Sequence, residues 1–291
     1  MKPRKRLASL LAACLFAATP GAARAQSFPD LGSLGKSLSG KDSALPAGLG
    51  DIMGHVKDLT GSQSTDDEIQ SGEDIAAPVF GAAPPWRNPA VQSYVNLVGR
   101  NLARQVERKD VQWRFAVLDT PSINAMAFPG GIVVITRGLY GLLKSEDELA
   151  AVLGHEIAHV NRRHQWKVIQ KQKVVALAAD TLARSDPART AKLVADLGAQ
   201  LIARGLDKSA EFEADRDGVV IAARAGYDSS GLITVMERLE ALKPGEADTA
   251  LLFSTHPSPQ ARIAALSAAA TPALEEAAEP SAAAARIRTA H

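Results

Sequence analysis

The segment from Leu149 to Val160 constrains this chain most, because it is apolar around its whole circumference and yet carries three ionisable side chains. Its large apolar residues are Leu149, Val152, Leu153, Ile157 and Val160, with Ala and Gly between them. A helix that is apolar on every side belongs in a protein interior. An unpaired polar group costs on the order of a few kcal/mol there. The segment therefore predicts a buried helix whose polar groups, His155, Glu156 and His159, share a partner.

A metal ion is the partner that best fits these three residues. His155 and His159 are four residues apart, so on a helix they project from one face, about 40° apart and roughly 6 Å apart along the axis. Two imidazoles at this spacing reach one Zn²⁺ ion at about 2.0–2.1 Å each. Glu156 lies about 100° round from His155, within reach of a water molecule at the metal. Core histidines bonded to backbone carbonyls are the alternative, but they do not explain three polar groups within five positions.

A catalytic zinc site needs a third protein ligand and an open position. The best candidate lies in Glu211-Phe212-Glu213-Ala214-Asp215. On a helix Glu211 and Asp215 share a face, whereas Glu213 points about 160–200° away. Glu211 would then bind the metal while Asp215 accepts a hydrogen bond from a ligand imidazole. A charged, solvated helix face would carry the same cluster, so the spacing alone leaves both interpretations open.

The remaining pattern from Glu68 to about residue 270 is mostly helical, with a small strand region. Val111–Val117 alternates apolar and polar residues, which predicts a half-buried strand. Ile132–Ile135 is β-branched throughout and should pair with it. Ser145 and Glu148 have the capping-box spacing and open a helix that should run through Arg163, with an extension to about Gln172 left open. Other helices are expected at Thr136–Leu143, Pro187–Arg204, Ser209–Ala225, Ser230–Leu242 and Pro259–Ala268.

Residues 1–25 have the pattern of a secretory signal peptide. A basic start precedes an apolar run, Leu7–Ala18, and Ala23-Arg24-Ala25 supplies small residues for cleavage. The run is too short for a permanent membrane helix. A Gly- and Ser-rich stretch at 26–67 predicts a flexible leader, and the Ala-, Glu- and Pro-rich end at 271–291 predicts a disordered tail. The expected domain is therefore 68–270.

Cleavage after Ala25 would change both the charge and the cysteine content. Losing the five basic residues of the signal leaves 28 basic and 32 acidic residues, a net charge of −4. A mildly acidic protein has no general attraction to nucleic acid. Cys14 is the single cysteine and would be removed with the signal. Alternatively Leu11-Ala12-Ala13-Cys14 is a lipobox, and the protein is a lipoprotein anchored through Cys14.

Taken together, these motifs resemble the gluzincin family of zinc metallopeptidases that includes HtpX, the Ste-type CaaX proteases and periplasmic BepA. The likeness is carried by His155–His159 followed by Glu211–Asp215, and it extends to Asn124–Gly131 and to Ser254-Thr255-His256-Pro257 with Arg262. It covers about Glu68 to Ala268. It implies an α+β, mostly helical, zincin-like single domain with a small β-sheet whose edge strand faces the active-site helix. The chain lacks the membrane helices of HtpX and the helical repeats of BepA, so it is closest to short periplasmic members.

The resemblance implies roles for individual residues. His155, His159 and Glu211 would bind one Zn²⁺ per chain, Glu156 would be the catalytic base and Asp215 would support a ligand. His256 would lie near the metal, either assisting the transition state or blocking the open position. A substrate peptide would pair along the strand at Gly131, Ile132, Val133 and Val134. His164 falls about 180° from His155 on an ideal helix, so we expect it to pack or cap rather than to bind metal.

The expected function is that of a periplasmic zinc endopeptidase in protein quality control. Its partners would be unfolded or misassembled envelope proteins as substrates, and the outer-membrane assembly machinery. One alternative is a chaperone-like or adaptor protein whose zinc site is gated by His256 and mostly inactive. A non-peptidase zinc hydrolase is a weaker alternative, because the Glu211–Asp215 pattern points to peptidases.

Overall fold

The β-branched run after the Pro129-Gly130-Gly131 turn forms the centre of a three-stranded sheet. The computed structural model describes residues 64–183, 208–242, 256 and 258–268, with side chains up to residue 173 in the first of these ranges. Strand β3 (Ile132–Thr136) pairs in parallel with β1 (Arg114–Leu118) and antiparallel with β2 (Ala125–Phe128), in the order β1-β3-β2. The predicted pairing of the two strand regions is confirmed, whereas β2 is not predicted by the strand pattern.

The prediction that a substrate pairs along Gly131, Ile132, Val133 and Val134 is wrong for this sheet. β3 is the central strand, and hydrogen bonds to β1 and β2 occupy both of its sides. A β-branched run marks burial on both faces rather than an edge. The edge strand that packs against the predicted metal-binding helix is β2. It has no second strand partner among the described residues.

Helices cover both faces of the sheet, which explains the uninterrupted apolar character of β3. Val133 and Ile135 point to one face, where they join a core with α5 (Pro89–Ala103) and α7 (Glu146–Asn161). Ile132 and Val134 point to the other, with Leu118, Phe128 and Ala76 of α4 (Thr65–Ala82). Helix α4 starts at Thr65, so its first turn lies inside the segment predicted as leader (26–67). Ser64 caps this turn by accepting a hydrogen bond from the Asp67 N–H at 3.0 Å.

Helix α7 is the predicted buried helix, and every residue from Glu146 to Val160 is buried. Its capping residue is confirmed, since Ser145 Oγ accepts from the Glu148 N–H at 3.1 Å. The helix ends at Asn161 rather than continuing through Arg163. Arg163 has a left-handed backbone (φ 55°), and α8 (His164–Ala183) starts directly after it.

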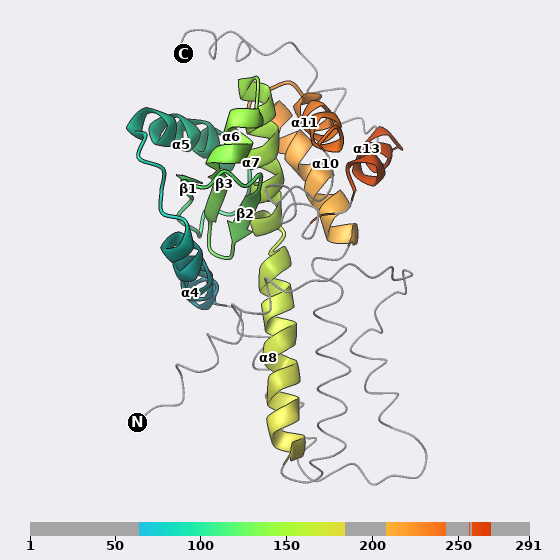
Figure 1. Cartoon of the computed structure of the whole chain (residues 1–291). Helices are drawn as coiled ribbons and strands as arrows, with labels where there is room; N and C mark the ends of the chain where they lie inside the picture. Colours follow the sequence, from blue (N-terminus) through green and yellow to red (C-terminus); the bar gives the residue numbers. More distant parts are fainter. Residues whose placement is uncertain (1–63, 184–207, 243–255, 257, 269–291) are drawn as a thin grey trace. The chain divides into compact units, whose positions relative to one another are not determined.

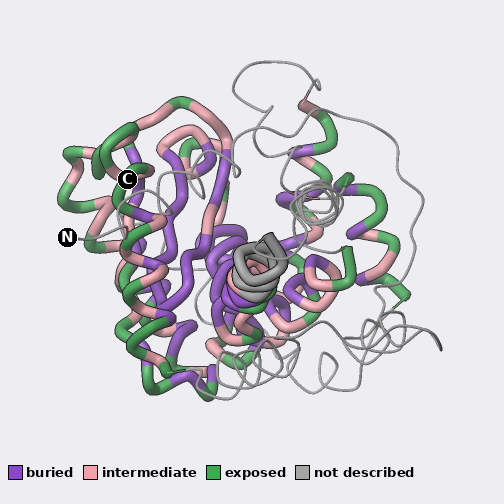
Figure 2. Tube along the Cα trace, turned by 90° about the horizontal axis from the view of Figure 1, so that it is seen from below, coloured by how far each residue is buried: buried purple, intermediate pink, exposed green. Residues whose placement is uncertain are grey.

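Three further helices lie on the side of α7 away from the sheet; the first two pack against α7, and the third packs against these two (Figure 1). They are α10 (Lys208–Arg224), α11 (Gly231–Glu240) and α13 (Pro259–Ala268), while the short α6 (Arg137–Leu142) follows β3. α10 makes the most extensive contact with α7. In Figure 2 the buried positions gather toward the centre of the view, whereas the outer helices alternate between buried, intermediate and exposed positions. The mostly helical α+β prediction is confirmed.

The chain divides into two contact units, and the elements above belong to the first, except α8 beyond Ile169, which belongs to the second. Within the described residues no helix combines the length and apolarity that crossing a membrane requires. Several predictions fall outside the described residues. They are the signal peptide, the lipid anchor at Cys14, the leader up to residue 63, the helix at Pro187–Arg204, and the tail.

Candidate metal centre

A close crossing of α7 and α10 builds the centre, and two glycines permit it. A Cβ on Gly218 would lie 2.7 Å from the backbone nitrogen of His155, and one on Gly154 would lie 2.7 Å from the Gly218 carbonyl oxygen. Any side chain at either position would push the helices apart. The backbones therefore touch beside His155, and this contact brings the acidic face of α10 against the histidine face of α7.

Three predicted ligands converge at this crossing. The two Nε2 atoms of His155 and His159 are 3.1 Å apart. Glu211 Oε1 lies 3.5 Å from His159 Nε2, and Glu211 Oε2 lies 3.7 Å from His155 Nε2. All three residues are buried, with 4 %, 1 % and 0 % exposure respectively. Because ligand atoms about 2.0–2.1 Å from a tetrahedral zinc stand about 3.3 Å from one another, the set fits that ion.

Glu211 supplies an independent sign that something is bound here. Its Oε1 is completely buried and has no hydrogen-bond partner. Buried carboxylate oxygens are rarely left without a partner, and each case calls for an explanation such as an ion. A cation between the two imidazoles would satisfy this oxygen. The residues therefore fit zinc by their spacing, by their donor types and by the unsatisfied oxygen.

His155 is held in place by Asp215 and Arg262. Asp215 Oδ1 lies 2.8 Å from His155 Nδ1, on the side of the ring away from the other ligands. Arg262 contacts both oxygens of Asp215, at 2.9 Å and 2.5 Å. Burial acts to raise the pKa of Asp215, but the Arg262 guanidinium outweighs it and lowers the pKa to about 2. Asp215 is therefore ionised and accepts the Nδ1–H of His155.

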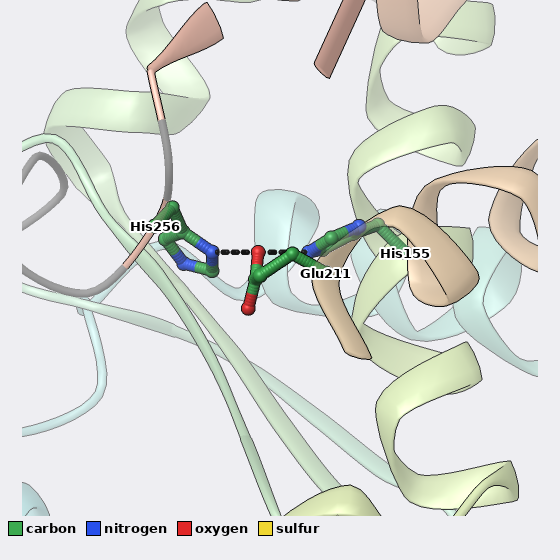
Figure 3. A group of neighbouring side chains, drawn as sticks. All are labelled: His155, Glu211 and His256. Atoms are coloured by element: carbon green, nitrogen blue, oxygen red, sulfur yellow. Dashed lines mark hydrogen bonds and ion pairs between the residues drawn. The ribbon is translucent and has the colours of Figure 1, made fainter. Parts of the chain in front are cut away.

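His256 lies beside the predicted ligands, as the resemblance implies. Its Nδ1 is 2.6 Å from Glu211 Oε2, and Glu211 stands between the rings of His256 and His155 in Figure 3. Burial acts to lower the pKa of His256, but the Glu211 carboxylate outweighs it and raises the pKa. His256 therefore contacts Oε2 of Glu211, whereas Oε1 is the oxygen without a hydrogen-bond partner.

Glu156 is buried and lines the same pocket as His155 and His256. It is 3 % exposed, and burial raises the pKa of its carboxyl group. A raised pKa makes a carboxylate a stronger base near neutral pH. Together with His155 and His256 it lines a pocket whose other walls are mostly apolar. These walls are formed by Ala125, Leu139, Val152, Leu232, Val235, Met236 and Leu239, with Arg262.

Two residues at the centre are not predicted as part of it. His164 Nδ1 lies 2.9 Å from His159 Nδ1, and His164 Nε2 lies 3.1 Å from Glu213 Oε2. The sequence places His164 opposite His155 only if the helix is unbroken, and the break after Asn161 removes that condition. A left-handed arginine gives no clear sequence signal, so nothing in the pattern reveals the break.

Comparison with known proteins identifies what the chain is similar to. The model of the family described as "Peptidase family M48" matches residues 89–270. The beta-barrel assembly-enhancing protease of Escherichia coli (strain K12) is 31 % identical over 206 residues, which is 68 % of this chain and 42 % of that protein. The mitochondrial metalloendopeptidase OMA1 of Schizosaccharomyces pombe is 34 % identical over 175 residues, 58 % of this chain and 50 % of that protein. The chain spans half or less of the length of these relatives.

Proposed function

The chain belongs to peptidase family M48, a family of zinc metallopeptidases, and from this we propose that it is an endopeptidase whose zinc is held by His155, His159 and Glu211. The observation that carries the assignment of these ligands is their convergence at the crossing of α7 and α10, with the buried Oε1 of Glu211 unsatisfied. The ion is bound by residues of one chain, so one Zn²⁺ is expected per chain.

The residues around the ion divide the chemistry between them. Zn²⁺ bound here would polarise the scissile carbonyl and acidify a water molecule. The Glu156 carboxylate would take the proton from that water and pass it to the leaving amine. Its raised pKa suits both steps. Asp215 would keep the His155 ring oriented throughout, because Arg262 fixes the carboxylate from the other side.

The surroundings of Glu156 indicate the class of substrate. β2 has a free edge within the described sheet and packs against α7, so an extended peptide could pair with its main chain. The neighbouring pocket, with walls from α6, α7 and α11, would take an apolar side chain. An extended backbone and exposed apolar residues are both properties of unfolded chains. This supports action on unfolded or misassembled proteins rather than on one folded partner.

The envelope is the proposed place of action. The secretory pattern of residues 1–25 supports export to the periplasm. The likeness to a protein named beta-barrel assembly-enhancing protease supports unassembled envelope proteins as substrates and the outer-membrane assembly machinery as a partner. Anchoring through Cys14 remains the alternative to a free periplasmic form.

The Glu156→Gln variant tests the function. Glutamine keeps the size of the side chain but cannot accept the proton, so we expect zinc content to stay at one ion per chain while casein cleavage falls by about 10²–10⁴-fold. Metal analysis and cleavage assays on the same preparations measure both. Full activity in the variant would contradict the mechanism. The inactive variant also serves to trap bound substrates for identification.

One contact favours a second candidate, an envelope chaperone-like or adaptor protein with a gated zinc site. His256 lies 2.6 Å from Glu211 and could close the open position. The His256→Ala variant separates the two functions in the same casein assay. Faster cleavage would show that His256 blocks the open position of the zinc site, and slower cleavage would show that it takes part in the reaction. Inactivity of both forms with zinc present would support the adaptor and contradict the peptidase.

A further inference from the structure

His159 has a second contact that the zinc site alone does not explain. The ring nitrogen away from the ligand cluster, Nδ1, lies 2.9 Å from His164 Nδ1, and the two rings meet nearly edge to face at 74°. The far nitrogen of His164, Nε2, lies 3.1 Å from Glu213 Oε2. His164 is 5 % exposed, whereas the Glu213 side chain is 36 % exposed. A chain of contacts thus runs from a buried ligand to a partly solvated carboxylate.

The break between α7 and α8 puts His164 in this position. In an unbroken helix residue 164 would lie on the side opposite His155. Instead Arg163 adopts a left-handed backbone, and His164 returns to the ligand side. A left-handed backbone is unfavourable for a residue other than glycine, because its Cβ then lies too close to the following carbonyl oxygen. The buried Glu68 of α4 offsets this, since its Oε2 lies 3.1 Å from Arg163 Nε and 3.0 Å from Arg108.

Zinc binding by His159 would determine where the ring protons lie in the series of contacts from His159 through His164 to Glu213. If His159 binds zinc through Nε2, its proton is on Nδ1. That N–H can donate only to an unprotonated His164 Nδ1, so His164 carries its proton on Nε2 and donates it to Glu213. Every donor then meets an acceptor. The opposite tautomer of His164 would bring two N–H groups together at 2.9 Å.

We propose that His164 and Glu213 are positioning residues that fix the tautomer and ring orientation of His159 for zinc. The proposal rests on the zinc site of the proposed function. It gives the two histidine ligands different supports, because His155 donates directly to Asp215 while His159 donates to an imidazole that a carboxylate orients. Each acidic residue of the Glu211–Asp215 segment then has a role at the zinc site: Glu211 binds the ion, Asp215 orients His155, and Glu213 orients His164.

Zinc affinity of the purified full-length protein, measured by chelator competition, tests the proposal without relying on activity. His164→Phe keeps an aromatic ring but removes the acceptor, and we expect the dissociation constant to rise about 10–100-fold, the usual cost of losing such a support. His164→Asn places an amide oxygen near the former Nδ1 and should restore affinity to within about threefold of wild type. Glu213→Leu, at a partly exposed position, should weaken binding in the same direction, by up to about 10-fold.

Two controls separate positioning from packing. Lys167→Ala changes an exposed residue of α8 and should leave affinity unchanged. Thermal unfolding of the metal-free variants reports packing alone. Wild-type affinity in His164→Phe and Glu213→Leu would overturn the proposal. Equal weakening in His164→Phe and His164→Asn, with matching losses of thermal stability, would also overturn it. A wild-type protein that binds no zinc would instead contradict the proposed function.

Discussion

Individual hydrogen-bonded ion pairs allow the buried helix α7 to carry charged residues, as Glu148 in its first turn shows. Glu148 is 4 % exposed and pairs with Arg238 of α11, whose two terminal nitrogens lie 2.5 Å and 2.8 Å from the carboxylate. It also accepts the Lys144 N–H at 2.7 Å. Burial acts to raise the pKa of Glu148, but Arg238 and the backbone hydrogen bond outweigh it, and the pKa is lowered.

This lowered pKa predicts a pH-dependent contribution to stability. A carboxyl group whose folded pKa lies below its unfolded value of about 4.3 stabilises the fold above that pH, and the contribution is lost as the pH falls through the folded pKa. Glu148→Gln should therefore lower the free energy of unfolding by about 1–3 kcal/mol at pH 7, a value between exposed and buried ion pairs. The unfolding free energies of metal-free wild type and variant, measured in urea, should begin to converge below about pH 4 and meet as the pH falls through the folded pKa of Glu148. A gap that is constant with pH would contradict this.

At the residue scale the sequence singles out residues of the candidate centre where chemistry and spacing coincide. His155, Glu156 and His159 follow from three polar groups on an apolar helix. Glu211 is left undecided by spacing, because a solvated helix face has the same pattern, and the unsatisfied Oε1 supplies what spacing lacks. His164 is assigned to packing or capping, since helical geometry cannot anticipate a left-handed residue.

At the scale of elements, the reciprocal glycines of α7 and α10 position the acidic residues. Gly154 and Gly218 allow the two backbones to touch. Glu211 and Asp215 then reach the histidines from the same helix. The sequence predicts both helices but not their crossing, because it depends on two glycines far apart in the chain that look like ordinary helix positions.

Gly218→Ala should open this crossing. Its Cβ would meet His155 backbone atoms at 2.7–2.8 Å, so we expect a loss of about 1–3 kcal/mol in unfolding free energy, the usual cost of overpacking. Zinc affinity should fall with it, because the ligands on the two helices move apart. Gly81→Ala in α4 is the matched control, since its Cβ would have no neighbour within 4 Å. Wild-type stability and affinity in Gly218→Ala would show that the crossing does not set the ligand geometry.

The sheet shows the limit of periodicity as a guide to elements. β-branched residues identify β3, and the Ser145 cap identifies the start of α7. The position of a strand within its sheet depends on what pairs with it, so the edge assigned to β3 belongs to β2. A short strand such as Ala125–Phe128 has too few alternating residues to be recognised.

For the molecule as a whole, the fold class and the metallopeptidase assignment follow from motifs that lie far apart in the sequence. The family match over residues 89–270 and the mostly helical fold confirm both. Substrate and location are properties of the whole protein, and the chain spans half or less of the two relatives described above. These remain proposals that trapping with Glu156→Gln can test.

The central claim is that one zinc ion joins α7 and α10 through His155, His159 and Glu211. Diffraction from crystals of the zinc-loaded protein, measured on both sides of the zinc absorption edge, tests it most directly. The account predicts one anomalous peak per chain, about 2.0–2.2 Å from the Nε2 atoms of His155 and His159 and from a carboxylate oxygen of Glu211. The absence of a peak at this crossing, or a peak held by other residues, would contradict the account.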